Sequence, residues 1–245
     1  MRHQTEHSPL FSPTALLGSG AMLPVFQPLP VVRRPRPFNA SDWLFELKYD
    51  GFRALPYVDY RGCRLVSRNG HGFASFSALT SSIARSMEGT AAIFDGEIVC
   101  VDRKGRPRFN DLLFRRGDAR FFAFDLLYLD GKDLRYDQLA DRKAALRKVL
   151  NSRGNDSGLH YADHVRGSGV ALCDRVCEMD LEGIVAKHAT APYLSYHAIS
   201  TWYKIKNPRY SHAGRHELFE QERHSEPVPG WHSCDLACAG ADVHG

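Results

Sequence analysis

Hydrophobic and polar residues alternate with a period of two along several short segments between residues 43 and 206, a pattern typical of half-buried β-strands. The clearest is the strongly apolar segment 121–129, which ends in the turn pair Asp130-Gly131. Arg61-Gly62 separates two other segments and predicts a tight hairpin turn. In all, the pattern predicts strands over 43–48, 52–60, 63–67, 91–95, 97–101, 121–129, 183–187 and 201–206.

Two residues interrupt these predicted strands. Pro56 has no amide hydrogen to give to a neighbouring strand, so it predicts that 52–60 is an edge strand or contains a bulge. Gly96 separates the segments 91–95 and 97–101, which we therefore expect to be two strands.

Apolar residues recur at helical spacing in three other segments. One carries Phe76, Leu79, Ile83 and Met87 on a single face, and Ser75 is placed to cap its N-terminus. The other two cover 137–150 and 168–181. Because helices and strands mix without the regular alternation of a doubly wound sheet, we expect an α+β fold of antiparallel sheets flanked by helices.

The two ends of the chain lack such periodicity. The first forty residues are rich in proline, and the basic stretch Arg33-Arg34-Pro35-Arg36-Pro37 is typical of a solvated linker and also compatible with a contact to a DNA backbone. Met1 and Met22 are both candidate start residues, and after Lys206 the sequence turns polar and aperiodic. We expect an extended proline-rich lead-in (1–40), a folded domain (41–219) and a disordered tail (220–245).

Composition narrows the class of protein. The chain has 245 residues, of which 43% are hydrophobic and 24% charged, which excludes a mainly disordered chain and a small disulfide-stapled scaffold. Its net charge of +4 is compatible with a polyanionic partner but does not establish one. Apolar runs stay below the roughly 18 residues of a membrane helix, and the N-terminus lacks the basic start of a signal peptide. We therefore expect a cytoplasmic monomer with no membrane partner.

The six cysteines contain no C-x-x-C pair, so the usual spacing of a zinc ribbon is absent. Cys173 and Cys177 lie four residues apart on the same helical face as Val176, and we expect them to be buried as small hydrophobic residues. Cys234 and Cys238 form a loose cluster in the tail, where we do not expect a structural metal.

One string of residues points to chemistry. Glu46-Leu47-Lys48-Tyr49-Asp50-Gly51-Phe52-Arg53 places a lysine at the end of a predicted strand, before a turn that contains Asp-Gly. A lysine amine becomes a nucleophile when burial or neighbouring positive charge lowers its pKa. Alone, the string is equally typical of a hairpin with a surface lysine. No P-loop motif is present, so we do not expect a P-loop phosphotransferase.

Five more strings follow in order: Ser67-Arg68-Asn69-Gly70, Phe94-Asp95-Gly96-Glu97-Ile98-Val99, Phe122-Ala123-Phe124-Asp125-Leu126-Leu127-Tyr128, Glu182-Gly183-Ile184-Val185-Ala186-Lys187 and Trp202-Tyr203-Lys204-Ile205-Lys206. The six together resemble the motif series of the covalent nucleotidyltransferases. The closest resemblance is to the adenylation domain of ATP-dependent DNA ligases, in particular the bacterial type associated with end-joining repair, and it spans about residues 25–219. It implies the nucleotidyltransferase (ATP-grasp-like) adenylation fold.

The resemblance implies a reaction at one group of residues. Lys48 matches the lysine that attacks the α-phosphate of ATP, releases pyrophosphate and becomes lysyl-AMP; the AMP then passes to the 5′-phosphate of a nick in double-stranded DNA, which is sealed in DNA repair or recombination. Lys204 and Lys206 match phosphate-contacting lysines, and Lys187 is expected to add positive charge there. Glu182 matches a carboxylate that helps hold a divalent cation, Mg²⁺ or Mn²⁺.

The resemblance also implies how the nucleoside is held. Glu97 matches the residue that accepts hydrogen bonds from the ribose hydroxyls, and Arg53 matches one that contacts ribose or phosphate. Arg68 matches an arginine that binds a phosphate of the nucleotide or of the nicked end. Phe124 matches the aromatic residue that stacks on adenine, and Glu46 is expected near the adenine edge.

Members of the family continue after the last lysine motif into an oligonucleotide-binding barrel, and the residues after Lys206 show no run of five alternating strands. We therefore expect poor nick sealing by the isolated chain. It is either an adenylation module that works with a DNA end-binding or barrel-supplying partner near the nucleoid, or a shortened, impaired copy. Two other readings stay open: an RNA ligase or mRNA capping guanylyltransferase, and a nucleotide- or DNA-binding module that has lost the reaction.

Overall fold

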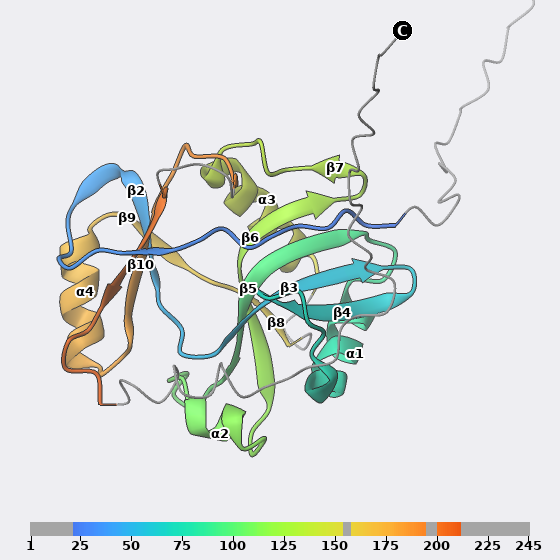
Figure 1. Cartoon of the computed structure of the whole chain (residues 1–245), viewed down its shortest axis with the longest axis horizontal. Coiled ribbons are helices and arrows are strands. Elements are labelled where there is room, and N and C mark those ends of the chain that lie inside the picture. The colour runs from blue at the N-terminus through green and yellow to red at the C-terminus, as the bar shows by residue number, and fades with distance from the viewer. Residues whose placement is uncertain (1–21, 154–157, 195–199, 212–245) are drawn as a thin grey trace, which may run out of the picture.

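The computed structural model describes residues 22–153, 158–194 and 200–211, and within these ranges the chain forms two β-sheets (Figure 1). The first sheet has the strand order β1 (Val32–Arg33), β11 (Trp202–Lys206), β10 (Gly183–His188), β2 (Ala40–Leu47) and β9 (His164–Gly167). The second has the order β4 (Gly62–Ser67), β3 (Phe52–Asp59), β5 (Ala92–Cys100), β6 (Ala119–Leu129) and β7 (Lys132–Asp133), with β8 (Leu159–Tyr161) also paired to β6. The pairs β1–β11 and β6–β8 are parallel and the others antiparallel.

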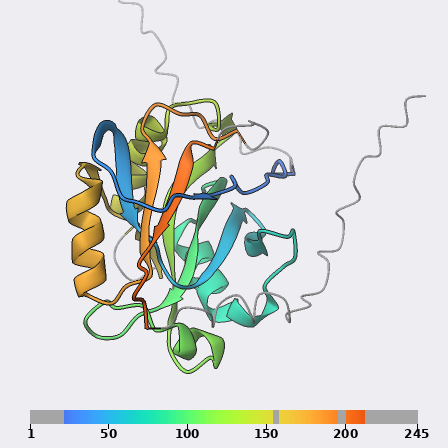
Figure 2. The ribbon, with the colours of Figure 1, turned by 60° about the vertical axis from the view of Figure 1, so that its left-hand side comes forward.

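Helices cover the outer faces of both sheets. The helix α4 (Gly169–Glu178) packs on β10 and β2 of the first sheet, as Figure 2 shows. On the second sheet, α1 contacts β4, α2 contacts β5 and α3 contacts β6. The bounds of these elements are η1 (Ala74–Phe76), α1 (Ser77–Ser86), α2 (Phe109–Leu113) and α3 (Leu139–Asn151). The α+β fold of antiparallel sheets flanked by helices is thereby confirmed.

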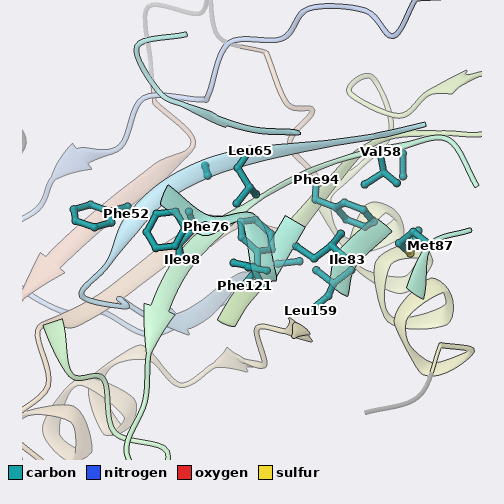
Figure 3. Packing of buried hydrophobic residues seen from close by; sticks show 14 of the residues in the cluster. Phe52, Val58, Leu65, Phe76, Ile83, Met87, Phe94, Ile98, Phe121 and Leu159 are labelled. Atoms are coloured by element: carbon teal, nitrogen blue, oxygen red, sulfur yellow. The ribbon is translucent and has the colours of Figure 1, made fainter. Parts of the chain in front are cut away.

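Three apolar cores lie between these sheets and helices. The largest lies between the second sheet and its helices, where Phe94, Phe121 and Ile83 meet (Figure 3). A second core lies between the two sheets, and a third under α4. Neighbouring residues of β2 face opposite ways, so that Leu44 enters the core between the sheets while Phe45 packs under α4. Apolar residues therefore cover parts of both faces of the first sheet.

Two expectations about interrupted strands were wrong. Residues 92–100 form one continuous strand, and Gly96 is needed there because a Cβ atom would lie 2.4 Å from the backbone oxygen of Phe122. Pro56 lies in β3 between β4 and β5, not at an edge. It is tolerated because the recorded pairing with β5 stops at Ala54 and resumes at Tyr57. The missing amide hydrogen thus falls in a gap of the ladder.

The predicted helix cap was also wrong. Ser75 lies in the short helix η1, α1 begins after Phe76, and no side-chain hydrogen bond caps α1. The hydroxyl of Ser75 instead accepts a hydrogen bond from Arg115. The pattern also missed the short elements α2, β1, β7, β8 and β9, which have five residues or fewer and so carry too little periodicity to stand out.

The described part of the lead-in, residues 22–40, is largely extended, as its prolines suggest, but it is also packed. Leu23, Phe26 and Leu29 are buried in the core between the sheets, and β1 pairs with β11. In Figure 1 this segment runs across the front of both sheets. Cys173 is buried under α4 and Cys177 is partly buried, whereas Cys234 and Cys238 lie outside the described residues. No helix in the described ranges has the length and apolar character to cross a membrane.

Candidate active site

A cleft of about 510 Å³ opens between the inner faces of the two sheets. All ten residues singled out in the sequence line it, although they come from positions 46 to 206: Glu46, Lys48, Arg53, Arg68, Glu97, Phe124, Glu182, Lys187, Lys204 and Lys206. The structure therefore brings together every candidate residue, while the role of each in binding or catalysis stays a prediction.

The first sheet supplies one wall of the cleft through strict alternation. Across β2, β10 and β11 the register aligns Glu46 with Val185 and Lys204, and Gly183 with Lys206. Residues aligned across strands, and residues two apart along a strand, point to the same face. Glu46, Lys204 and Lys206 therefore share the inner face of this sheet with Leu44 and Trp202 of the core between the sheets.

The second sheet supplies the opposite wall. Arg53 on β3 pairs with Glu97 on β5, which pairs with Phe122 on β6, so these three side chains form a row. Phe124 lies two residues farther along β6 on the same face. Arg68 follows the end of β4 at the rim of the cleft.

Lys48 is fixed where β2 ends. Its backbone nitrogen donates to the carbonyl of Gly183 at 2.9 Å, and its Nζ lies 2.6 Å from Oε2 of Glu182. Three residues later Gly51 approaches β5 so closely that a Cβ atom would lie 2.2 Å from the carbonyl oxygen of Ile98. Because Gly51 has no side chain, the turn after Lys48 packs directly against β5 of the opposite sheet, beside Glu97.

Positive charge gathers at this end of the cleft. The pKa of Lys204 is lowered from its usual value, first by burial and then by the neighbouring charges of Lys48, Lys206 and Arg68. Four cations therefore lie close enough to repel one another in the described chain. An anion with several charges, such as a polyphosphate, would relieve that repulsion.

Glu97 is half-buried, and the charges of Lys48 and Arg53 act on it. Burial raises its pKa to about 8, a shift that the charges of Lys48 and Arg53 oppose and that the carboxylates of Glu182 and Asp95 reinforce. A carboxyl with this pKa is largely protonated at neutral pH and can both donate and accept hydrogen bonds. That suits a residue expected to contact ribose hydroxyls.

The other end of the cleft is aromatic. The rings of Phe124 and Trp202 lie 5.7 Å apart and nearly perpendicular, and Nζ of Lys187 sits 4.0 Å and 3.9 Å from their centroids. Such a surface offers a flat ring a place to stack. The ammonium of Lys187 also lies 2.6 Å from Oε2 of Glu46, and its expected contribution of charge at the phosphates stays a prediction.

Glu46 is held between two buried lysines. Its Oε1 accepts from Nζ of Lys143 on α3 at 2.6 Å, and Lys143 also donates to the carbonyl of Ala162 at 2.9 Å. Burial would raise the pKa of Glu46, but the two ammonium groups outweigh it and lower that pKa. Burial lowers the pKa of Lys187 to about 8. Glu46 therefore stays ionised, and its negative charge offsets the positive charges of Lys143 and Lys187 at the aromatic end of the cleft.

The segment before β1 closes one side of the cleft and is tied to it by a polar network. Tyr193 Oη accepts from the backbone nitrogen of Leu29 at 2.8 Å and donates to Oδ2 of Asp95 at 2.7 Å. Asp95 is fully buried and pairs with Arg53 through two hydrogen bonds of 3.0 and 2.7 Å. Arg53 in turn donates to the carbonyl of Leu29 at 2.8 Å. Both the N–H and the C=O group of the Leu29 backbone are therefore hydrogen-bonded within this network.

Sequence reasoning missed four of these residues: Leu29, Lys143, Tyr193 and Trp202 in its role as a wall of the cleft. Lys143 had a readable signal, because it occupies a buried position on the apolar side of α3 between Leu139 and Leu146. Leu29 and Tyr193 had none, because nothing in their local sequence indicates a partner more than 160 residues away.

The Tyr193 network leads to a testable expectation. Replacing Tyr193 with phenylalanine leaves the buried backbone N–H of Leu29 without its acceptor, which costs about 1–3 kcal/mol of unfolding free energy. Because Leu29 lines the cleft, we also expect ATP to bind several-fold more weakly. Chemical denaturation and ATP titration measure the two effects, and Tyr136→Phe, at an exposed tyrosine, is the control. Unchanged stability and ATP affinity would contradict this function of the network.

Glu97 leads to an expectation about pH. Because folding raises its pKa from 4.5 to about 8, the folded state binds its proton more tightly than the unfolded state. Its contribution to stability is complete below pH 4.5 and is lost as pH rises through about 8. We expect the Tm of the native chain, compared with Glu97→Gln, to fall steadily between these pH values. A Tm difference that stays constant with pH would contradict the raised pKa.

Comparisons with known proteins agree with this geometry. A family model described as an ATP-dependent DNA ligase domain matches residues 34–206. The multifunctional non-homologous end joining protein LigD of Mycobacterium bovis is 34% identical over 173 residues, which are 69% of this chain and 22% of the relative. The bifunctional non-homologous end joining protein LigD of Bacillus subtilis is 29% identical, over 73% of this chain and 33% of that protein. The chain thus spans between about a fifth and a third of these relatives.

Among solved structures, a mycobacterial DNA ligase D in complex with ATP and MES is similar in fold. Its TM-score is 0.65 at 29% sequence identity, and the match covers 74% of this chain and 60% of that chain.

Proposed function

The chain belongs to the family of ATP-dependent DNA ligase domains, and from this premise we propose that its cleft binds ATP and that Lys48 accepts the AMP group. The observation that carries the proposal is the position of the Lys48 amine. It lies at the cationic end of a cleft whose other end is formed by Phe124 and Trp202. A nucleotide has the matching polarity, with a flat base at one end and a polyphosphate at the other.

In the proposed complex the base stacks on Phe124 at the aromatic end, with Glu46 near its edge. Glu97 and Arg53 face the ribose, and the triphosphate extends toward Lys204, Lys206 and the rim residue Arg68. This order runs from the buried side chains of Trp202 and Lys187 to the exposed Arg68. In this arrangement the triphosphate supplies negative charge opposite the cluster of Lys48, Lys204, Lys206 and Arg68.

The proposed reaction is a displacement at the α-phosphorus. The lone pair of Lys48 Nζ forms an N–P bond while the bond from that phosphorus to the bridging oxygen breaks, and pyrophosphate leaves with the electron pair. The amine loses a proton and the product is a lysyl-AMP phosphoramidate. The cations contribute by stabilising the charge that develops on the phosphate oxygens, and positioning supplies much of the rate in such transfers.

The residues present fit a divalent cation held largely by its substrate. Within the described residues no group of three or more His, Cys, Asp or Glu side chains could form an all-protein metal site. Mg²⁺ commonly uses one or two carboxylates together with substrate phosphates and water, and Mn²⁺ accepts similar oxygen ligands. We propose that Glu182, whose carboxylate faces Lys48, holds the ion. When bound, the ion neutralises phosphate charge.

We further propose that the AMP group is passed to the 5′-phosphate of a nick in double-stranded DNA, and that the whole reaction serves end-joining repair. The names of the LigD relatives support this assignment, because they describe proteins of non-homologous end joining. A DNA end-binding or barrel-supplying protein partner, and a place near the nucleoid, stay predictions.

Incubation with ATP labelled in its α-phosphate, in the presence of Mg²⁺, tests the proposal. We expect one covalent label per chain, released by acid as a phosphoramidate is, and transfer of that label to nicked DNA. Preferential labelling by GTP would indicate a capping-type enzyme, and preferential sealing of nicked RNA an RNA ligase. ATP binding without any covalent label would show that the chain is a binding module and would overturn the proposed reaction.

A further inference from the structure

A second cavity, of about 590 Å³, lies at the edge of the second sheet, and the proposed reaction does not use it. It is formed by the first turns of α1, the end of α2, and the strands β6 and β8. Its polar lining includes Arg85, Arg115, Arg120, His160 and Ser75.

The charge of this cavity is positive. Three arginines and one carboxylate, Asp118, line it, and within the described ranges no salt bridge holds any of these arginines. Arg115 donates to the hydroxyl of Ser75 at 2.8 Å, which leaves other donors of its guanidinium for a ligand. Guanidinium groups bind phosphate oxygens through paired hydrogen bonds. The cavity is therefore suited to a phosphate.

The nucleotide cleft and this cavity are joined by one row of side chains. Glu97 on β5 pairs with Phe122 on β6, and Phe122 pairs with His160 on β8. Figure 3 shows Phe121 and Leu159, the neighbours of Phe122 and His160 in sequence, in the core on the other face. The row therefore faces away from that core, and it covers two strand spacings, or about 10 Å.

Aromatic side chains cover this row. Tyr49, the residue after Lys48, stacks on Phe122 with ring centroids 4.6 Å apart, and Phe122 stacks on His160 at 5.3 Å. Burial and the charge of Arg120 lower the pKa of His160, so its imidazole is neutral at neutral pH. The surface between the two cavities is thus aromatic and uncharged, and it ends at arginines.

We propose that the second cavity binds a backbone phosphate of the DNA strand that enters the active cleft, while sugars or unpaired bases of that strand lie over the aromatic row. Alternating aromatic and cationic groups are the usual surface for a nucleic acid strand, because rings contact sugars or bases and cations contact phosphates. A free anion would use the arginines but not the row. The inference rests on the proposed function, since it extends the path of the same DNA substrate.

Charge removal tests the site. The variant Arg85→Gln/Arg115→Gln/Arg120→Gln changes exposed side chains, and its control Arg61→Gln/Lys132→Gln/Arg175→Gln removes three exposed charges outside both cavities. Binding of a nicked duplex is measured over a range of salt concentrations. We expect the first variant to bind the duplex about tenfold more weakly. The slope of log affinity against log salt concentration should also become shallower, by an amount that corresponds to about one to two fewer counterions released on binding. Covalent labelling by ATP, which needs no DNA, is expected to be unchanged.

A second measurement locates the phosphate. Duplexes carry a single uncharged methylphosphonate at successive positions within about four nucleotides of the nick. At one position the native chain and the control should lose affinity while the arginine variant does not. Equal losses in all three proteins, or unaltered DNA binding by the arginine variant, would overturn the inference. So would inorganic phosphate binding in the cavity without any methylphosphonate effect. If the native chain accepts no covalent label from ATP, the proposed reaction is overturned instead. The two failures can be told apart because DNA binding and ATP labelling are measured separately.

Discussion

Replacing Lys48 with alanine is expected to abolish covalent labelling by ATP, a fall in rate of at least about 10⁴-fold, because removal of a nucleophile leaves only binding and charge stabilisation. The cations around the phosphates stay in place, so ATP should still bind. Lys48 is partly exposed and ends a strand, and Lys204 stays near its partner Glu182, so we expect its loss to cost less stability than removal of a fully buried charge. The measurement is the amount of acid-labile label on the chain as a function of time.

Lys132→Ala is the matched control, since that lysine pairs with Asp137 on an exposed surface away from the cleft. It should label at the native rate. A Lys48→Ala chain that still accepts the label would show that another residue is the nucleophile, and mass spectrometry of the labelled peptide would identify it.

Replacing Glu46 with alanine is expected to cause the largest loss of stability, about 3–5 kcal/mol, because it leaves two ammonium groups buried without a carboxylate. The side chains of Lys143 and Lys187 are each only 1% exposed, so neither can reach water without moving the structure. For a domain of this size such a loss lowers Tm by roughly 6–20 °C. Thermal unfolding followed by circular dichroism measures it.

A compensated variant separates charge from packing. Glu46→Leu/Lys143→Met/Lys187→Met removes all three charges and keeps apolar volume, and we expect it to recover most of the lost Tm, because buried ion clusters are often replaced by apolar groups at little cost. Its ATP binding should stay weak, since Glu46 and Lys187 line the aromatic end of the cleft. If Glu46→Ala unfolds at the native Tm, the buried network contributes nothing to stability.

The sequence predicted most of the regular structure for a simple reason. Strands such as β6 and helices such as α3 are long enough for their periodicity to be read, and their observed bounds, Ala119–Leu129 and Leu139–Asn151, lie within two residues of the predicted ones. The short elements α2, β1, β7, β8 and β9 were missed. The interruptions at Gly96 and Pro56 were misread, because a close approach of β6 and a gap in a ladder are properties of neighbouring strands and not of the strand itself.

The α+β class, the family and the ten residues that line the cleft could all be predicted from the sequence, because short motifs keep their residue types and spacing along the chain. Which charges meet depends on how distant segments pack against each other in three dimensions. Lys187 pairs with Glu46 at the aromatic end, and Lys143 reaches the same carboxylate from a helix. Leu29 is bound by Tyr193, 164 residues away. Such pairings depend on the two sheets facing each other across one cleft, and no local pattern records that arrangement.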